Sequence, residues 1–283
     1  MPLGFSDQFG HYLPPADTDI ATALRTGLVA LDSNVLLSAY RFAPDARAVL
    51  FAAIECLGDR GFVPHQAALE FHANRFTVSA DHAAAYEQVL DTVADYRDLL
   101  EPDLLGRIRY LAFRTGLDPA ARDALQDLVT DALTPLATAV EGLRSRHGLA
   151  DDDAILHRFQ TLLDGRVGAA LPDDELAAAQ AEARRRVAAG LPPGYMDAEK
   201  ANPEGDYLIW LQVLDEARRR AAPWVVFVTG DLKEDWWFVR DGGRVACARP
   251  ELTAEAAAVA GARLVMLTTQ AFVRGYDTGG SAA

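Results

Sequence analysis

Short apolar runs that end abruptly in polar residues predict the strands of a buried parallel sheet. They cover Leu28–Leu31, Phe62–Val63, Trp224–Val228 and Arg263–Leu267. Continuous apolar runs of this kind are typical of strands that are covered on both faces. Helical patterns, such as the one from Val35 to Leu50, separate the runs. Strands that alternate with helices indicate an α/β fold with helices on both faces of the sheet.

The middle of the chain has a different pattern. From about Arg75 to Gly190 it is dominated by Ala, Leu, Arg, Asp and Glu, with helical stretches at Asp118–His147 and Asp173–Ala189 and no convincing strand. We therefore expect one domain over residues 1–283, with a core of about residues 28–75 and 195–275. The segment of about residues 76–194 is predicted to be a long helical insertion.

The chain is acidic: 41 Asp and Glu against 27 Lys and Arg give a formal net charge of −14. This balance argues against sequence-blind adhesion to nucleic acid, which depends mainly on Lys and Arg. It does not exclude a nuclease, because carboxylates gathered to hold metal ions add local negative charge and the bound cations then attract phosphate.

Cysteine content and hydropathy restrict the compartment. Cys56 and Cys247 cannot form a disulfide framework, so we expect a reducing, cytoplasmic environment. Residues 1–15 combine neither a basic start nor an apolar core, so no secretion signal is expected. The apolar stretches fall short of the roughly 20 residues of a membrane helix, and no membrane partner is predicted.

Four acidic residues lie just after predicted strands or near the start of predicted helices. They are Asp32, Glu70, Asp206 and Asp231. In parallel sheets, ligands bind outside the carboxyl ends of the strands. Mg²⁺ prefers oxygen ligands of this kind. Each residue also has a structural interpretation, because Asp32 and Asp206 are good helix caps, Glu70 fits a solvated helix face, and Asp231 fits an acidic turn.

Several motifs resemble those of a PIN-like domain family within the PIN nuclease superfamily. Leu31-Asp-Ser-Asn-Val-Leu-Leu37 resembles the opening motif of PIN domains, and Pro64–Arg75 resembles the second acidic motif of the family. Gly194–Lys200, Gly205–Trp210 and Phe227–Trp237 are similar to its closing motifs. The resemblance covers roughly residues 28–273, and its most specific part is the run that ends in Glu-Asp-Trp-Trp.

The resemblance implies a three-layer α/β/α sandwich around a parallel sheet and a nuclease site that uses Mg²⁺ or Mn²⁺. Asp32, Glu70, Asp206 and Asp231 match the acidic quartet, with Asp32 and Asp231 on the principal ion. The remaining expected site residues are Asp235 as an additional acid, Asn34 and Thr229 as supporting hydrogen-bonding residues, and Arg75, Lys200 and Lys233 as phosphate contacts. Repulsion among the carboxylates predicts that some have raised pKa values in the metal-free protein.

Other features of the motifs bear on substrate binding. Trp236 and Trp237 fit either base stacking or core packing at a strand end. The sequence departs from the family at Gly230, where an Asp is usual, and at Met196, where a Lys is usual. The first departure leaves Asp231 in place, whereas the second weakens the case for a basic substrate clamp. The runs Arg184–Arg186 and Arg218–Arg220 fit solvated helix faces better than nucleic-acid patches.

We therefore expect a metal-dependent nuclease that acts on RNA in preference to DNA, with a role as a toxin or defence effector. A second hypothesis is a non-catalytic module that engages a protein partner, or a second copy of the chain, through the helical insertion. A phosphohydrolase with an aspartyl nucleophile would need a second Asp two residues after Asp32, where Asn34 stands.

Overall fold

Four parallel strands form the central sheet of the computed structural model, which describes residues 9–147, 152–200, 202–240 and 244–277. The strands are β1 (Leu28–Leu31), β2 (Gly61–Phe62), β3 (Trp224–Thr229) and β6 (Arg263–Thr268), in the order β2-β1-β3-β6. All pairings are parallel, so the carboxyl ends of the strands meet at one edge. The four predicted strands are confirmed.

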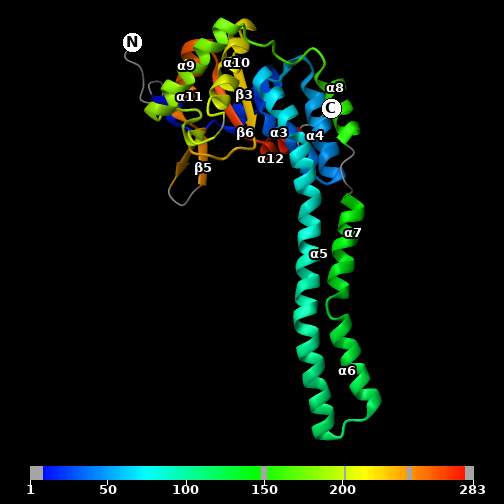
Figure 1. Ribbon diagram of the computed structural model, residues 1–283. Helices are drawn as coiled ribbons and strands as arrows, with labels where there is room; N and C mark the ends of the chain where they lie inside the picture. Colours follow the sequence, from blue (N-terminus) through cyan, green and yellow to red (C-terminus); the bar gives the residue numbers. More distant parts are fainter. Residues whose placement is uncertain (1–8, 148–151, 201, 241–243, 278–283) are drawn as a thin grey trace. The chain divides into compact units, whose positions relative to one another are not determined.

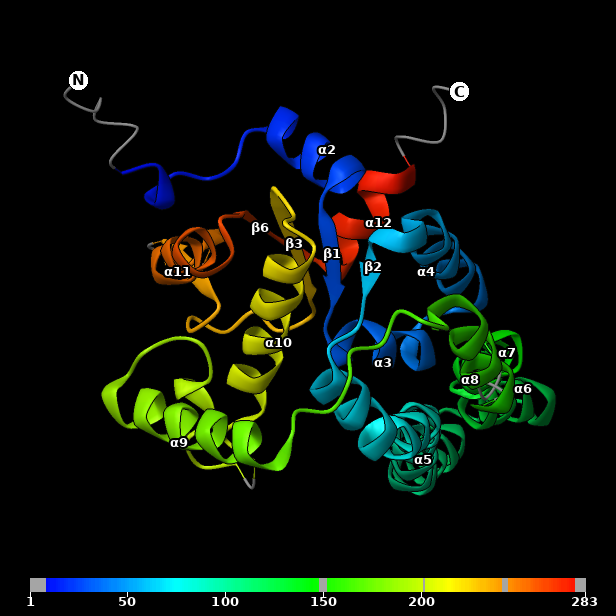
Figure 2. The ribbon, with the colours of Figure 1, turned by 90° about the horizontal axis from the view of Figure 1, so that it is seen from above.

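Helices cover both faces of this sheet (Figure 2). The chain passes from β1 to β2 through α3 (Ser33–Arg41) and α4 (Pro44–Leu57), and it enters β3 from α10 (Gly205–Arg219). α11 (Pro250–Ala260) leads to β6, and α12 (Thr269–Asp277) then packs against α4. Right-handed crossovers toward opposite edges place their helices on opposite faces. The result is the expected three-layer α/β/α sandwich.

Smaller elements complete this part of the chain. η1 (Gly10–Tyr12) and α2 (Asp17–Thr26) precede β1, and η2 (Gly58–Arg60) precedes β2. α8 (Asp152–Leu163), α9 (Asp173–Ala189) and η3 (Tyr195–Asp197) precede α10. An antiparallel pair, β4 (Trp237–Arg240) and β5 (Arg244–Ala248), follows β3 and was not predicted.

Two long helical patterns are interrupted in the structure. The pattern from Val35 to Leu50 divides between α3 and α4, with Phe42 and Ala43 in extended conformation. Pro44 explains this break, because a proline disfavours helical geometry in the residue before it. The stretch Asp118–His147 likewise divides into α6 (Pro119–Asp131), capped by the Asp118 side chain, and α7 (Thr134–His147).

The chain separates into two compact units: residues 1–75 with 153–283, and residues 76–152. α5 (His65–Thr115) supplies its first turns to unit 1 and the rest to unit 2. Within unit 2, α5 runs beside α6 and α7 (Figure 1), and an ion pair of 3.6 Å joins Arg144 on α7 to Glu87 on α5. Residues 153–194, which the sequence pattern assigned to the insertion, group with unit 1. Among the described residues, no helix is both long and apolar enough to cross a membrane.

Candidate functional site

Asp32 lies directly after β1, at the carboxyl edge of the sheet, and is the N-cap of α3. Its Oδ1 accepts hydrogen bonds from the Ser33 backbone N (2.6 Å) and Ser33 Oγ (3.2 Å). Its Oδ2 accepts from Asn34 Nδ2 (3.0 Å) and Thr229 Oγ1 (2.6 Å). Burial raises the pKa of Asp32, although all these donors favour its ionised form. The capping interpretation is therefore correct, and the same carboxylate also joins the ends of β1 and β3.

Glu70 lies on the second turn of α5 and faces Asp32 across Ser33. The Ser33 hydroxyl is 3.2 Å from Glu70 Oε2, and Gln66 Nε2 donates to Glu70 Oε1 at 3.0 Å. Burial, and to a lesser extent the charge of Asp32, raise the pKa of Glu70. Glu70 Oε1 also lies so close to α10 that a Cβ on Gly205 would collide with it. Glu70 is thus an ordered residue between two helices rather than part of a solvated surface.

Asp206 occupies the first turn of α10, next to Gly205. Its Oδ2 is buried and has no hydrogen-bond partner among the described residues. Burial raises the pKa of Asp206 well above its ordinary value, and the charges of Asp32 and Asp197 raise it further. The capping interpretation fails here, because the N-cap of α10 is Glu204 and no side chain caps this helix. A buried carboxylate oxygen without a donor is an available ligand for a cation.

Asp231 follows β3 in the turn Thr229-Gly-Asp231. Its backbone N donates to Thr229 Oγ1 at 3.0 Å, so one threonine hydroxyl connects it to Asp32. Its Oδ2 lies 2.9 Å from Lys233 Nζ. The same lysine lies 2.6 Å from Asp197 Oδ1, and Lys200 Nζ lies 2.6 Å from Asp197 Oδ2. Two of the expected phosphate contacts are therefore ion-paired with carboxylates of the site.

Asp235 is fully buried and its Oδ2 accepts two backbone hydrogen bonds, from Gly194 N (3.0 Å) and Met196 N (3.2 Å). Its Oδ1 has no partner among the described residues. Burial raises the pKa of Asp235, and the two backbone donors oppose that rise. Asp235 therefore holds the Gly194–Asp197 turn against the segment between β3 and β4. This turn also borders Asp206, since a Cβ on Gly194 would lie 3.3 Å from the Asp206 Cβ.

The two tryptophans after Asp235 belong to the core, so base stacking by them is excluded. Trp236 is 2% and Trp237 3% exposed. Trp236 stacks on Phe227 with ring centroids 4.8 Å apart and meets Trp210 edge-on. Trp237 Nε1 donates to the Asp231 backbone O at 2.6 Å. This aromatic packing fixes the acidic turn against the sheet.

The five candidate acids are thus brought to one edge of the sheet, with raised pKa values for Asp32, Glu70, Asp206 and Asp235. The direction of these pKa shifts agrees with the expectation, but their main cause is burial rather than the expected repulsion among the carboxylates. Within the described part of the chain, no three Asp, Glu, His or Cys side chains converge into a ready-made metal centre. The donor set nevertheless fits a hard divalent cation, because it consists of carboxylate oxygens and two of them are buried without a donor.

The remaining basic residues of the sequence analysis are Arg75 and the two arginine runs. Arg75 lies on α5, five residues beyond Glu70, and is partly exposed. The arginine runs form ion pairs with neighbouring acids: Arg185 and Arg186 with Glu182, and Arg219 and Arg220 with Glu216. Arg185 and Arg219 are solvent-exposed, as expected for a solvated helix face, whereas the side chains of Arg186 and Arg220 are only 15% and 27% exposed.

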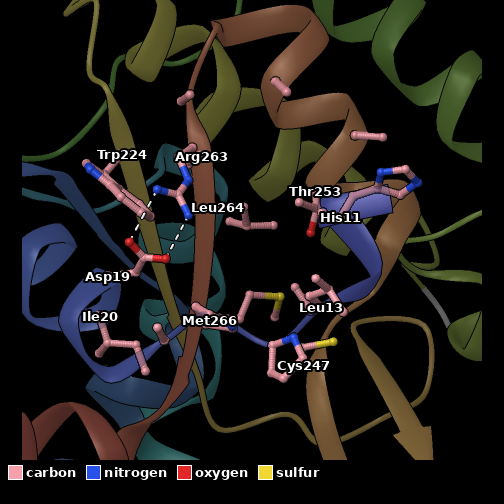
Figure 3. A pocket seen from close by; sticks show the side chains of 18 of the residues that line it. His11, Leu13, Asp19, Ile20, Trp224, Cys247, Thr253, Arg263, Leu264 and Met266 are labelled. Carbon is pink, nitrogen blue, oxygen red and sulfur yellow. Dashed lines mark hydrogen bonds and ion pairs between the residues drawn. The ribbon is translucent and has the colours of Figure 1, made fainter. Parts of the chain in front are cut away.

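A cavity of about 700 Å³ lies elsewhere in unit 1, beside β6 (Figure 3). Its lining is largely apolar and includes Leu13, Leu264 and Met266. Arg263 and Asp19 form an ion pair of 2.8 Å at this cavity, so their charges cancel. The Arg263 guanidinium also lies over the Trp224 ring. None of the candidate acids lines this cavity, so it does not mark the carboxylate site.

Sequence reasoning missed several residues that order the site. Ser33 bridges Asp32 and Glu70, and the Gln212 side chain on α10 accepts from the Gln66 backbone N at 3.0 Å. Asp197 is the most consequential omission, because it is buried and holds both lysines. The sequence contained a signal for Gln66. It lies four residues before Glu70, which places both side chains on the same face of a helix. For Asp197 the signal was its position between Gly194 and Lys200, in a segment similar to a closing motif of the family.

The chain was compared with known protein families, curated proteins and solved structures. A family model described as PIN like domain matches residues 28–252, which contain all the candidate site residues. Searches of the curated proteins and of the solved structures found no match.

Proposed function

Because the chain belongs to the PIN-like domain family and has its nuclease-type fold, we propose that it is a divalent-metal-dependent nuclease that hydrolyses phosphodiester bonds. RNA is the favoured substrate over DNA, since the PIN superfamily consists mostly of ribonucleases. The observation that carries the proposal is that Asp32, Glu70, Asp206, Asp231 and Asp235 lie at the carboxyl edge of the sheet. Two of their buried oxygens, Asp206 Oδ2 and Asp235 Oδ1, have no hydrogen-bond donor among the described residues.

Asp32 and Asp231 would hold a principal Mg²⁺ or Mn²⁺ ion, and Glu70, Asp206 and Asp235 would complete the ligand set. When bound, such a cation lowers the pKa of water and neutralises charge on the phosphodiester. The chain itself orients the carboxylates: Asn34 and Thr229 fix Asp32 Oδ2, and the Trp237 indole fixes the Asp231 backbone. Preorganised ligands of this kind need little rearrangement during the reaction.

Lys200, Lys233 and Arg75 are the proposed phosphate contacts. Lys233 lies within ion-pair distance of Asp231, so its ammonium group is already beside a proposed metal ligand. A phosphate that approaches Asp231 would therefore meet a positive charge as well as the carboxylates. This arrangement gives an acidic protein a local positive charge at the proposed site, where it can attract a polyanion.

Cleavage assays test the proposal directly. Purified protein is incubated with end-labelled single-stranded RNA and DNA of the same sequence in Mn²⁺, Mg²⁺ or EDTA. We expect cutting that requires a divalent cation and favours RNA. Cutting that persists in EDTA, or no cutting of either polymer in either metal, contradicts the proposed function.

A second candidate function is a non-catalytic binding module that engages another protein chain through unit 2. One observation favours contact with a further chain: unit 2 exposes large apolar side chains, among them Phe113 (85%) and Leu99 (70%). Light scattering of the chain and of a Leu99→Gln, Phe113→Gln variant tests self-association. A monomeric mass for both excludes a second copy as the partner.

A further inference from the structure

Asp197 is a buried carboxylate that holds two ammonium groups, one on each oxygen. It ends η3, and both Lys200 Nζ and Lys233 Nζ lie 2.6 Å from it. The Lys200 backbone N also donates to the Asp197 backbone O at 2.9 Å, which closes the turn between them. The three residues carry a net charge of +1 beside the candidate acids.

The exposure of these side chains is graded. The Asp197 side chain is 9% exposed, whereas those of Lys233 and Lys200 are 30% and 60% exposed. The anion is therefore inside and the cations face outward. Burial alone would raise the pKa of Asp197, but the hydrogen bonds from the two lysines outweigh it and hold that pKa below its ordinary value. Asp197 thus remains ionised and keeps its hold on both lysines.

We propose that Asp197 is a positioning residue that holds Lys200 and Lys233 together as a clamp for a phosphate group of the substrate, an inference that rests on the proposed nuclease function. An ammonium group has three N–H donors. Contacts with Asp197 and Asp231 use two of those on Lys233, and the contact with Asp197 uses one on Lys200. Donors therefore remain on both lysines for phosphate oxygens.

The double contact of Lys233 matters for the clamp. Asp231 is a proposed metal ligand, so its carboxylate has a second use. Because Lys233 also contacts Asp197, it keeps one ion-pair partner when the Asp231 carboxylate binds a cation. Within the described part of the chain, the side-chain hydrogen bonds of Asp197 go to these two lysines. Its role is therefore to place them, which also explains why a buried acid faces the site without joining the quartet.

The direction of the affinity change in one variant distinguishes this role from a general electrostatic effect. Removing a negative charge from a chain with net charge −14 strengthens the binding of a polyanion by simple charge balance. If Asp197 positions the lysines, its removal weakens that binding instead. Glu199→Gln is the matched control, since Glu199 is an exposed acid in the same turn and loses the same charge.

The experiment measures the affinity of the full chain for a fluorescent single-stranded oligoribonucleotide in Ca²⁺, a hard cation that takes oxygen ligands at longer distances than Mg²⁺. We expect Asp197→Asn to weaken binding several-fold, whereas Glu199→Gln leaves it unchanged or tighter. The dependence of log K on log salt should become shallower by about 0.7 for each lost lysine–phosphate contact. Asp197→Glu, which keeps the carboxylate, should restore part of the affinity.

A double-mutant cycle distinguishes positioning from a general effect on folding. In a Lys200→Gln, Lys233→Gln background, Asp197→Asn should cause no further loss. If Asp197→Asn does not fold, the Lys200→Gln, Lys233→Gln variant provides the test. A loss of oligoribonucleotide affinity in this variant that is no larger than the loss in Arg184→Gln overturns the clamp. If the wild type binds and Asp197→Asn behaves like Glu199→Gln, the inference alone fails. If the wild type neither binds nor cuts nucleic acid, the proposed function fails as well.

Discussion

Thr229 Oγ1 donates a hydrogen bond of 2.6 Å to Asp32 Oδ2, although 197 positions separate the two residues in the sequence. The bond joins the ends of β1 and β3, which are neighbours in the sheet. The same hydroxyl accepts from the Asp231 backbone N at 3.0 Å. One buried side chain therefore sets the spacing of the two acids proposed to hold the principal cation.

Replacing Thr229 by Val should destabilise the protein, because Val keeps the shape and removes the hydroxyl. Asp32 then loses a donor in a buried position, and the expected decrease in the free energy of unfolding is about 1–3 kcal/mol. Urea denaturation measures it. Thr229→Ser keeps the hydroxyl and should retain most of the stability; a loss in Thr229→Ser without a loss in Thr229→Val would show that the methyl group, not the hydrogen bond, is what matters.

Asp206→Asn should stabilise the metal-free protein at neutral pH. The pKa of Asp206 is raised well above 3.8 in the folded protein by burial and by the charges of Asp32 and Asp197. Folding therefore favours the neutral form of Asp206. The stability that the neutral form contributes is fully present below the pKa of Asp206 in the unfolded chain, and it is lost as the pH rises through the pKa of Asp206 in the folded protein.

Melting temperatures of the metal-free wild type and Asp206→Asn, recorded from pH 4 to pH 8, test this sign. The variant should gain a few degrees at pH 7, where about 1 kcal/mol corresponds to roughly 2–4 °C, and little at pH 4. A variant that is less stable than the wild type at pH 7 but not at pH 4 would mean that the Asp206 carboxylate is stabilising when charged.

Mn²⁺ should stabilise the wild type by binding to the folded state. The expected gain is about 2.7 kcal/mol at a concentration 100 times the dissociation constant. Asp231→Asn should lose most of this gain because it removes a charged ligand. Calorimetric titration and thermal melting with and without EDTA provide the two readouts, and an undiminished Mn²⁺ effect in the variant contradicts the proposed role of Asp231.

Gly205→Ala should disturb the site without removing a charge. A Cβ at this position would collide with Glu70 Oε1, so Glu70 must move away from α10. Gly106→Ala is the control, because that Cβ meets nothing within 4 Å and alanine favours a helix interior by about 0.5–1 kcal/mol. We expect weaker Mn²⁺ binding in Gly205→Ala alone; equal binding in both variants would remove Glu70 from the ligand set.

The strands and the order of the motifs were predictable from the sequence, because buried parallel strands leave continuous apolar runs. The β4–β5 pair was not, since Trp237 reads as part of the Glu-Asp-Trp-Trp motif and the strands are short. The break between α3 and α4 could have been predicted from Pro44 alone, because a proline disfavours helical geometry in the residue before it. In the helical middle, composition indicates helix but does not say that residues 153–194 group with unit 1.

The site was predictable as a set of acids but not as a network. Asp32, Glu70, Asp206, Asp231 and Asp235 were identified from their motifs, whereas the pairing of Lys200 and Lys233 with Asp197 depends on contacts between distant segments. Base stacking by Trp236 and Trp237 was a reasonable alternative until their burial was known. Burial also determines the pKa values, and a sequence pattern does not supply it for a polar residue at a strand end.

Whether the carboxylates at the sheet edge carry the reaction is tested by cleavage of labelled RNA in Mn²⁺, compared for the wild type, Asp32→Asn, Asp231→Asn and Asp45→Asn. Asp45 is exposed in the first turn of α4, so its variant is a control for the loss of one charge. We expect cutting by the wild type and Asp45→Asn that EDTA abolishes, and loss of cutting in both site variants while they remain folded. Cutting by Asp32→Asn and Asp231→Asn at the wild-type rate would show that these carboxylates do not carry the reaction.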